Sequence, residues 1–365
     1  MTENIEGKKS ILPHFTESIR QKLNEKLAAA QSEDSREEKR FPGASVAESI
    51  FQKLSEKRAA ALNEDNREEK RSAGALMAEK ILRTVNDGHL SSVEKTEEFL
   101  HKRAAVEDEP LRLVKSRLSR DNGEVIDFLN IKIVCFGDHR TASHTVLYLH
   151  GGGYTEEVNP FHLNYCAKLA ERIGALVLVP IYPLAPNHIW KETYDILTEL
   201  YKIILKEKQG SVTIMGDSAG GGLAIAFCQY LKTVDLVQPD HLICLSPWVD
   251  VCMEDTDYEP YRPLDPMLDV AGLQTYGKAW AGDLDLRDPR ISPTFGDNHG
   301  LPKTLLITGT RGIFYPDICK FYENMRKDGC DVELMVGEGM NHVYPIYGLP
   351  ESKPAVARID EVILS

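Results

Sequence analysis

The chain has 365 residues, of which 42% are hydrophobic and 27% are charged, so it is long enough to build a large domain with a substantial core. Its formal net charge is −13 at pH 7, which argues against a nucleic-acid-binding protein, since such proteins need a basic face. No run of eighteen apolar residues or signal peptide is visible, and seven scattered cysteines without a Cys-x-x-Cys pair suit reduced thiols, so we expect a cytoplasmic protein without stable membrane insertion.

The first 72 residues contain a duplicated charged segment. Residues 16–40 and 47–71 are offset by 31 positions and are identical at 18 of 25 positions, which indicates a tandem duplication. Apolar residues recur at four-residue spacing, as at Ile19 and Leu23, so each unit is expected to form an amphipathic helix. Residues 1–72 are predicted to form a charged helical extension that is solvated, pairs two copies in a homodimer, or covers the active site.

Apolar runs that are typical of strands alternate with helical stretches over the rest of the chain. The expected strands are 131–136, 145–149, 175–180, 211–215, 242–246, 303–308 and 332–336, and the expected helices are 160–173, 190–208, 219–232, 317–328 and 350–365. Such alternation predicts an α/β domain with a mostly parallel central sheet flanked by helices. We assign residues 116–365 to this domain.

A glycine-rich loop follows the expected strand at 145–149. The segment His150–Gly153 reads His-Gly-Gly-Gly. Glycines allow backbone N–H groups to turn toward a developing negative charge, as they do in the oxyanion loop of esterases. We expect Gly151 and Gly152 to supply two of these donors, the alternative being a plain glycine turn after a strand.

A Gly-x-Ser-x-Gly motif follows the expected strand at 211–215. The segment Gly216–Gly220 reads Gly-Asp-Ser-Ala-Gly and leads into the expected helix at 219–232. In this context the motif forms a nucleophile elbow, a strained turn that needs glycines because neighbouring backbone passes close to it. Ser218 is therefore the expected nucleophile, and the N–H of Ala219 is the expected third oxyanion donor.

A histidine follows the last expected strand, 332–336. His342 fits the serine–acid–histidine order of hydrolases that have such an elbow. We expect it to accept the proton of Ser218 and to return that proton to the leaving group.

Together these segments resemble the hormone-sensitive-lipase-like esterases of the α/β-hydrolase fold, from about residue 110 to the C-terminus. The resemblance includes Tyr-Pro-Leu-Ala-Pro at 182–186, Leu-Ser-Pro-Trp-Val-Asp at 245–250, Asp-Pro-Met-Leu at 265–268 and Ile-Ser-Pro at 291–293. It implies an α/β-hydrolase fold in which the first strands pair antiparallel and residues 73–115 contribute helices to a cap. Tyr154, directly after the glycine-rich loop, would line the acyl side of the site.

The resemblance also implies a catalytic carboxylate at position 312, where this chain has glycine. Glycine cannot orient the imidazole of His342, and disabling the aspartate of a chymotrypsin-type triad lowers turnover about ten-thousand-fold. Three interpretations of Gly312 stand side by side. Another carboxylate reaches His342, either Asp250 or Asp317, although the latter also suits a cap of the following helix. The second is a variant whose acid was removed, and the third is a protein that has lost hydrolysis.

We therefore expect a serine hydrolase of small to medium carboxylic esters or lactones that works through an acyl-enzyme on Ser218. The alternative is a hydrolytically impaired or non-hydrolytic protein that binds a ligand or catalyses an elimination. The chain has no phosphate-binding loop and no zinc-ligand spacing, so no cofactor and no metal are expected. The expected partner is a small-molecule ester or lactone, and no nucleic acid.

Overall fold

The computed structural model describes residues 71–105, 123–254 and 256–365. The duplicated segment within residues 1–72 lies outside the described residues apart from its last positions, so its helices stay a prediction.

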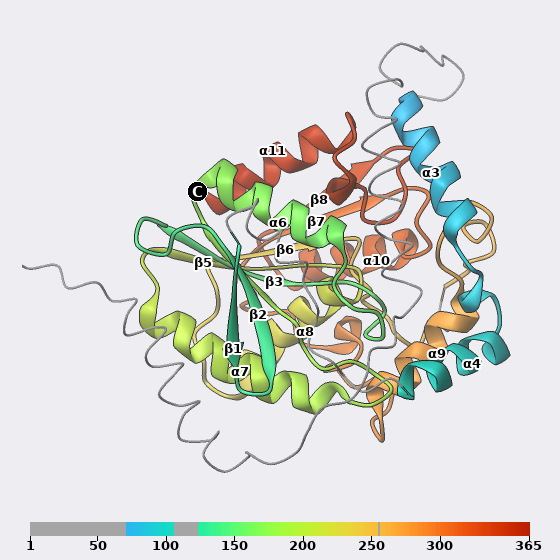
Figure 1. Ribbon diagram of the computed structural model, residues 1–365, viewed down its shortest axis with the longest axis horizontal. Coiled ribbons are helices and arrows are strands. Elements are labelled where there is room, and N and C mark those ends of the chain that lie inside the picture. Colours follow the sequence, from blue (N-terminus) through green and yellow to red (C-terminus); the bar gives the residue numbers. More distant parts are fainter. Residues whose placement is uncertain (1–70, 106–122, 255) are drawn as a thin grey trace, which may run out of the picture.

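The described residues form one central sheet of eight strands (Figure 1). Its strands are β1 (Glu124–Phe128), β2 (Ile131–Phe136), β3 (His144–Leu149), β4 (Leu176–Pro180), β5 (Ser211–Asp217), β6 (His241–Leu245), β7 (Lys303–Gly309) and β8 (Val332–Gly337). Their order in space is β1-β2-β4-β3-β5-β6-β7-β8. β2 pairs antiparallel with β1 and β4, whereas all other neighbouring pairs are parallel. This topology confirms the mostly parallel sheet and its antiparallel start.

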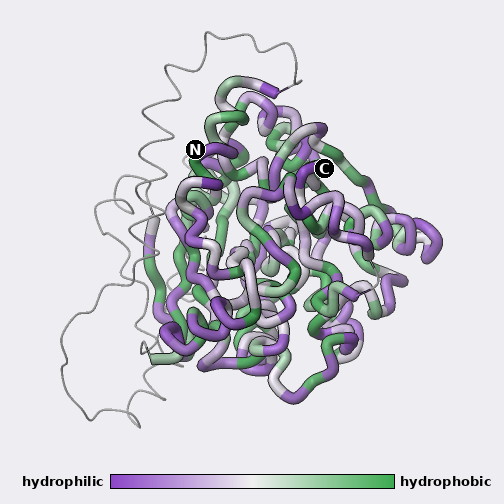
Figure 2. The backbone as a smooth tube through the Cα atoms, turned by 90° about the vertical axis from the view of Figure 1, so that its right-hand side faces the viewer, coloured by the Kyte–Doolittle hydropathy of each residue, from purple (hydrophilic) through white to green (hydrophobic). Residues whose placement is uncertain are grey.

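Helices cover both faces of the sheet (Figure 1). One face packs against α6 (Pro160–Ile173) and α11 (Ser352–Ile363), and the other against α7 (Trp190–Glu207), α8 (Ala219–Thr233) and α10 (Tyr315–Lys327). Side chains of a strand alternate between the faces, so Val146 and Tyr148 join one core cluster while Leu147 and Leu149 join the other. Hydrophobic and hydrophilic stretches alternate along the chain accordingly (Figure 2).

Two elements escaped the sequence analysis. The edge strand β1 is exposed over its first residues, and its sequence Glu-Val-Ile-Asp-Phe mixes apolar and acidic residues without a buried run. Helix α9 (Val270–Ala281) contains two glycines, which lower its helical propensity. Gly277 is retained because its Cβ would lie 2.2 Å from the side chain of Val251. Packing against distant parts of the chain, rather than local sequence, therefore stabilises both elements.

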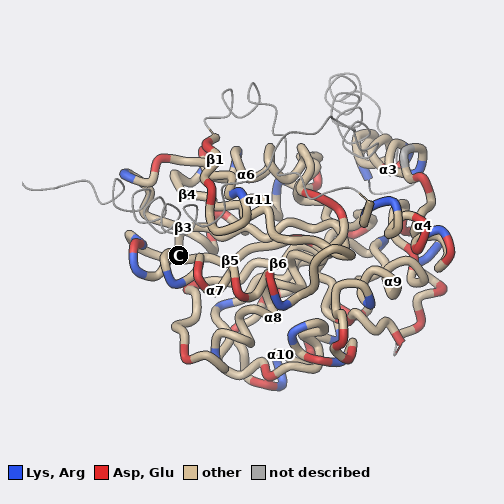
Figure 3. Tube along the Cα trace, turned by 60° about the horizontal axis from the view of Figure 1, so that its bottom comes forward, with Lys and Arg blue, Asp and Glu red and all other residues tan. Residues whose placement is uncertain are grey.

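The segment expected to contribute to a cap contains α3 (Ala73–Val85) and α4 (Val93–Ala104). α4 packs beside α9 at one end of the sheet (Figure 1). Basic and acidic residues both occur along α3, α4 and α10 (Figure 3). That the segment acts as a cap stays a prediction, and residues 106–115 lie outside the described ranges.

All seven cysteines are described and unpaired. Within the described ranges, no helix combines the length and the apolar character needed to cross a bilayer. No group of His, Cys, Asp and Glu side chains in the same ranges is arranged to hold a metal ion.

Candidate active site

The turn between β5 and α8 holds Ser218 in a strained conformation. Its φ of 52° and ψ of −123° are uncommon for a residue with a side chain, and such strain is concentrated at functional turns. The N–H of Ser218 donates to the carbonyl of Leu245 at 2.8 Å, and the N–H of Trp248 donates to the carbonyl of Ser218 at 2.9 Å. These bonds fix the serine against the end of β6, and 9% of its surface stays exposed.

Packing requires both glycines of the motif around Ser218. A Cβ on Gly216 would lie 2.3 Å from the carbonyl oxygen of Gly220, and a Cβ on Gly220 would lie 2.1 Å from that of Leu149. Both distances are steric clashes, so neither position accepts a larger residue without backbone movement. The Gly-x-Ser-x-Gly pattern therefore reflects close contact between the elbow and the end of β3, which leads into the glycine-rich loop.

Asp217 ties the glycine-rich loop to the elbow. Its buried carboxylate accepts hydrogen bonds from the hydroxyl of Tyr148 at 2.7 Å, the N–H of Gly151 at 3.0 Å and Nε2 of His162 at 3.1 Å. Nδ1 of His162 accepts from the N–H of Asn159, so Nε2 carries the proton. Burial alone would raise the pKa of Asp217, but its polar partners hold that pKa below the usual value. The carboxylate is therefore a charged anchor behind the loop, which the sequence analysis did not single out.

The contact with Asp217 corrects the expectation that Gly151 supplies an oxyanion donor, because its N–H already donates to a carboxylate. Within the described ranges, the N–H groups of Gly152, Gly153 and Ala219 donate to no protein acceptor. The glycine pattern alone cannot distinguish these amides, since the distinction depends on a side chain 66 positions away. The available donors are therefore Gly152, Gly153 and Ala219.

The segment at 182–186 also contacts the glycine-rich loop, on a different side from Asp217. The hydroxyl of Tyr182 donates to the carbonyl of His150 at 2.6 Å, and the two rings stack with centroids 4.3 Å apart. The N–H of Ala185 donates to the carbonyl of Tyr154 at 2.8 Å. Contacts at both ends of the loop therefore fix its path. Tyr154 itself is buried, and its role beside an acyl group stays a prediction.

β6 brings His342 to the same edge of the sheet as Ser218. The N–H of Val343 donates to Oγ of Ser246 at 3.0 Å, and Ser246 directly follows the residue whose carbonyl holds Ser218. His342 is 3% exposed, and its ring lies edge-on to Phe314 with centroids 5.2 Å apart. Neither ring nitrogen has a hydrogen-bond partner among the described residues, Ser218 included. Burial lowers the pKa of His342 to about 4, so the imidazole is neutral at pH 7.

Gly312 lies against the backbone of His342. A Cβ on Gly312 would have the N and Cα of His342 at 3.7 Å and the carbonyl oxygen of Gly309 at 3.5 Å, which are ordinary contacts. Its φ lies outside the left-handed region, so the backbone does not require glycine. A Cβ on Gly309, by contrast, would lie 2.3 Å from the carbonyl oxygen of Met340. Position 312 therefore accepts a Cβ beside the backbone of His342 without a steric clash.

This contrast gives a matched pair of substitutions. We expect Gly309→Ala to lower the free energy of unfolding by about 2 kcal/mol or more, because the backbone around the new methyl group has to move. Gly312→Ala should leave that free energy unchanged or raise it by up to about 1 kcal/mol, because alanine restricts the unfolded chain. Urea denaturation followed by circular dichroism measures both. Equal destabilisation by the two substitutions would contradict the space inferred at position 312.

The two carboxylates considered as substitutes for the acid are engaged elsewhere. Asp317 accepts hydrogen bonds from the hydroxyls of Thr256 and Tyr258, so the expectation that it caps the following helix is wrong. Asp250 accepts the backbone N–H groups two and three residues further along its own turn. Neither carboxylate is hydrogen-bonded to His342, whose ring nitrogens are both unpaired.

Another buried carboxylate, Asp265, supports the loop after Gly312. It accepts hydrogen bonds from the N–H groups of Ile313 at 2.9 Å, Met267 at 2.9 Å and Leu268 at 3.0 Å. Burial raises its pKa to about 6 despite these donors. Its hydrogen bonds span two segments of the chain, which makes Asp265 a structural link between them.

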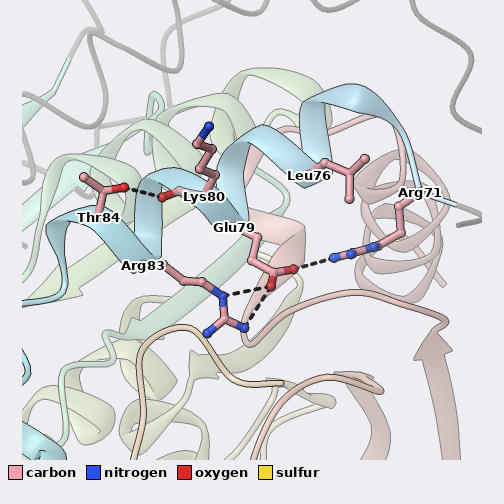
Figure 4. Close-up of a pocket in the computed structure, with 6 residues that line it drawn as sticks. All are labelled: Arg71, Leu76, Glu79, Lys80, Arg83 and Thr84. Carbon is pink, nitrogen blue, oxygen red and sulfur yellow. Dashed lines mark hydrogen bonds and ion pairs between the residues drawn. The ribbon is translucent and has the colours of Figure 1, made fainter. Parts of the chain in front are cut away.

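A surface pocket of about 290 Å³ lies along α3 and does not include the serine (Figure 4). It is lined by Arg71, Leu76, Glu79, Lys80, Arg83 and Thr84. Glu79 accepts hydrogen bonds from both of these arginines and from Arg311. Burial opposes ionisation, but these guanidinium groups hold the pKa of Glu79 below its usual value. Because Arg311 precedes Gly312, the ion cluster anchors α3 to the loop that carries position 312.

Known proteins share this architecture. A family model of the alpha/beta hydrolase fold matches residues 146–346, more than half of the chain. An acetyl-hydrolase from Streptomyces hygroscopicus is 31% identical over 221 residues, which cover 60% of this chain and 74% of that protein. An esterase from Acinetobacter venetianus is 30% identical over 230 residues, which cover 62% and 76%.

A solved structure agrees with these sequence relatives. The crystal structure of a hormone-sensitive-lipase homologue from a metagenome library matches with a TM-score of 0.66 and 25% identity, covering 80% of this chain and 97% of that chain. The eight-stranded sheet of the described residues and the elbow after β5 fit this relationship. The chain therefore belongs to the α/β-hydrolase family, within its hormone-sensitive-lipase-like esterases, and is a hydrolase of the carboxylesterase type.

Proposed function

We propose that the chain hydrolyses small to medium carboxylic esters or lactones through an acyl-enzyme on Ser218. Oγ of Ser218 attacks the acyl carbon while its proton passes to Nε2 of His342. The N–H groups of Gly152, Gly153 and Ala219 stabilise the oxyanion, and a donor of this kind typically contributes about 3–4 kcal/mol to lowering the barrier. His342 then protonates the leaving alcohol, and water releases the acyl group by the reverse proton transfers.

One observation supports this proposal more strongly than any other. The strained Ser218 lies beside the glycine-rich loop, and the N–H groups of Gly152 and Gly153 in that loop and of Ala219 at the start of α8 have no protein acceptor within the described ranges. Such donors are costly to leave unpaired and suit a charge that appears only during the reaction. The name of the esterase among the relatives supports ester substrates, and the name of the acetyl-hydrolase supports a small acyl group.

Gly312 lowers the expected rate without removing the nucleophile or the base. We infer that neither Asp250 nor Asp317 replaces the acid, because both are hydrogen-bonded elsewhere and His342 has no hydrogen-bond partner among the described residues. The same observation favours the second candidate, a protein on this scaffold that binds a ligand or catalyses an elimination. The reactivity of Ser218 distinguishes the ester hydrolase from the protein that binds a ligand or catalyses an elimination.

A fluorophosphonate probe tests that reactivity. We expect covalent labelling of the full chain at neutral pH, detected by intact-protein mass spectrometry, and loss of labelling in Ser218→Ala. Ser211→Ala, at the other end of β5, is the matched control and should label like the parent. His342→Ala should label much more slowly because the base is gone. A parent chain that remains unlabelled while folded would favour the binding protein.

The pH dependence of labelling reports on His342. Protonation of the imidazole removes the base, and burial places the pKa of His342 at about 4. The labelling rate should therefore be level from about pH 6 to 8 and decline only below that range, toward a midpoint near the lowered pKa. Circular dichroism at each pH confirms that the chain is folded. A midpoint at about 6.5, the ordinary value for histidine, would contradict a base in a desolvated site.

A further inference from the structure

We propose that Arg103 is a positioning residue that reaches from α4 to the glycine-rich loop and keeps the N–H groups of Gly152 and Gly153 in place for the oxyanion. This inference rests on the proposed function of Ser218 and adds to it a residue from the segment that precedes the sheet. The guanidinium acts through the backbone of the loop and does not itself touch the substrate.

One face of α4 is directed toward the rest of the protein. Thr96, Phe99 and Arg103 follow one another at three- and four-residue spacing, which places them on the same side of the helix. Thr96 and Arg103 are buried, whereas the neighbouring Lys102 is exposed. An arginine is rarely buried unless its guanidinium has polar partners. The partners of Arg103 therefore explain why this helix buries a charged side chain.

The guanidinium of Arg103 contacts the turn that continues from the glycine-rich loop. Its Nε donates to the carbonyl oxygen of Thr155 at 3.2 Å, 52 positions further along the chain, and its Nη2 donates to Oε1 of Glu157 at 3.5 Å. A hydrogen bond from a charged donor is stronger than one between neutral groups, and the bond to Thr155 is buried. Arg103 therefore fixes the backbone of the loop at Thr155.

Thr155 belongs to the same turn as the two oxyanion amides. The N–H groups of Thr155 and Glu156 donate to the carbonyl of Gly152 at 2.9 and 2.8 Å, which closes the turn. Within it, Gly152, Gly153 and Tyr154 have φ values of 121°, 59° and 63°. Such conformations persist only where surrounding contacts impose them, above all for a residue with a side chain. The hydrogen bond to the carbonyl of Thr155 therefore restrains the turn that orients the N–H groups of Gly152 and Gly153.

Two further contacts join α4 and α9 to this turn. The ring of His89, just before α4, stacks on Phe99 with centroids 4.4 Å apart, and its Nε2 lies 3.6 Å from Oε1 of Glu156. The ring of Tyr276 on α9 lies directly against Gly153, since a Cβ added to that glycine would be 2.6 Å from it. α4 and α9 therefore hold the turn together, and the buried guanidinium supplies the charged part of this contact.

Arg103→Met tests this role in the full chain, because it removes the guanidinium and keeps an unbranched apolar side chain. We expect kcat for p-nitrophenyl acetate and the rate of fluorophosphonate labelling to fall about 10- to 100-fold, since a displaced oxyanion donor loses a factor of this size. KM should change by less than about three-fold, because the oxyanion forms only after binding. Lys102→Met removes the same charge from an exposed neighbour on α4 and should behave like the parent. Circular dichroism confirms that each variant is folded.

Arg103→Lys distinguishes the hydrogen bond from packing. Its ammonium can donate to the carbonyl of Thr155 but cannot also hold Glu157 as the planar guanidinium does, so kcat should lie between those of Arg103→Met and the parent. A trifluoromethyl ketone forms a tetrahedral adduct with the nucleophilic serine and places an oxyanion at the loop. Its affinity should fall in the same order as kcat, because both depend on the same amides.

The outcomes separate this inference from the proposed function. A parent chain that labels at Ser218 no faster than Arg103→Met would overturn the positioning role and leave the serine hydrolase intact. A slow variant with unchanged ketone affinity would also overturn it, because the loss would then not act at the oxyanion. An Arg103→Lys variant equal to the parent in both kcat and ketone affinity would do the same, which keeps the test decisive if Arg103→Met does not fold. A folded parent chain that does not label would overturn the proposed function and this inference together.

Discussion

Gly312→Asp is expected to raise kcat/KM for p-nitrophenyl acetate by about 10³- to 10⁴-fold, the factor lost when a chymotrypsin-type triad has its aspartate disabled. The Cβ of the new side chain has only ordinary contacts to His342, so the fold should accept it. A carboxylate beside His342 also favours the imidazolium, so the pKa of the base should rise from its lowered value. Steady-state rates measured from about pH 4 to 9 record both effects.

Gly312→Asn is the matched control, because it has the same shape without the charge. It should recover only a small part of the gain, since an amide orients the ring but does not stabilise its positive charge as a carboxylate does. Equal rates for Gly312→Asp and the parent chain, with both proteins folded, would contradict the assignment of position 312. The acid would then have to come from elsewhere, or the scaffold would serve a purpose other than ester hydrolysis.

Asp217→Asn is expected to lower the free energy of unfolding by about 2–4 kcal/mol, because a buried acceptor of several hydrogen bonds becomes a group with a donor amide facing other donors. In a domain of this size, each kcal/mol lowers Tm by about 2–4 °C. Freed from Asp217, the N–H of Gly151 would release the glycine-rich loop, so kcat should fall about ten-fold or more. Thermal unfolding and steady-state kinetics measure the two effects.

Asp127→Asn is the control for the loss of one negative charge, because Asp127 is exposed on β1 and should change stability by less than about 0.5 kcal/mol. The pKa of Asp217 is lowered in the folded state, so its charge stabilises the fold above the unfolded value of about 3.9. That contribution should be constant near neutral pH and should be lost as pH falls through the folded pKa. Equal unfolding free energies for Asp217→Asn and the parent at pH 7 would refute the anchoring role.

Local patterns predicted most of the sheet and its helices. The expected strand at 211–215 lies within β5, and the expected helix at 160–173 coincides with α6, because periodic apolar residues and caps act over a few neighbouring positions. β1 and α9 were missed, since an exposed edge strand has no apolar run and a glycine-containing helix has weak local propensity. Their stability comes from partners that are distant in the chain.

The residues of the candidate site also fall into two groups, those that local sequence predicts and those that only the fold places. The motif around Ser218 and the position of His342 after the last strand are readable because both depend on local context. The hydrogen bond between Gly151 and Asp217 cannot be predicted from the sequence, because it joins the loop after β3 to the end of β5, 66 positions away. Asp317 was likewise expected to reach His342 or to cap the following helix, whereas the fold brings two hydroxyl groups to it.

The amino-acid sequence by itself determined the alternating strands and helices, the elbow that carries Ser218, and the absence of a carboxylate at position 312. Only the tertiary structure decided which loop amides have no acceptor, which carboxylates are already bonded, and that a Cβ at position 312 makes only ordinary contacts. The physical reason is the distance along the chain over which each kind of interaction acts. Backbone propensity and periodicity act between neighbours in the chain, whereas hydrogen-bond partners and steric space are set by segments that meet only when the sheet has formed.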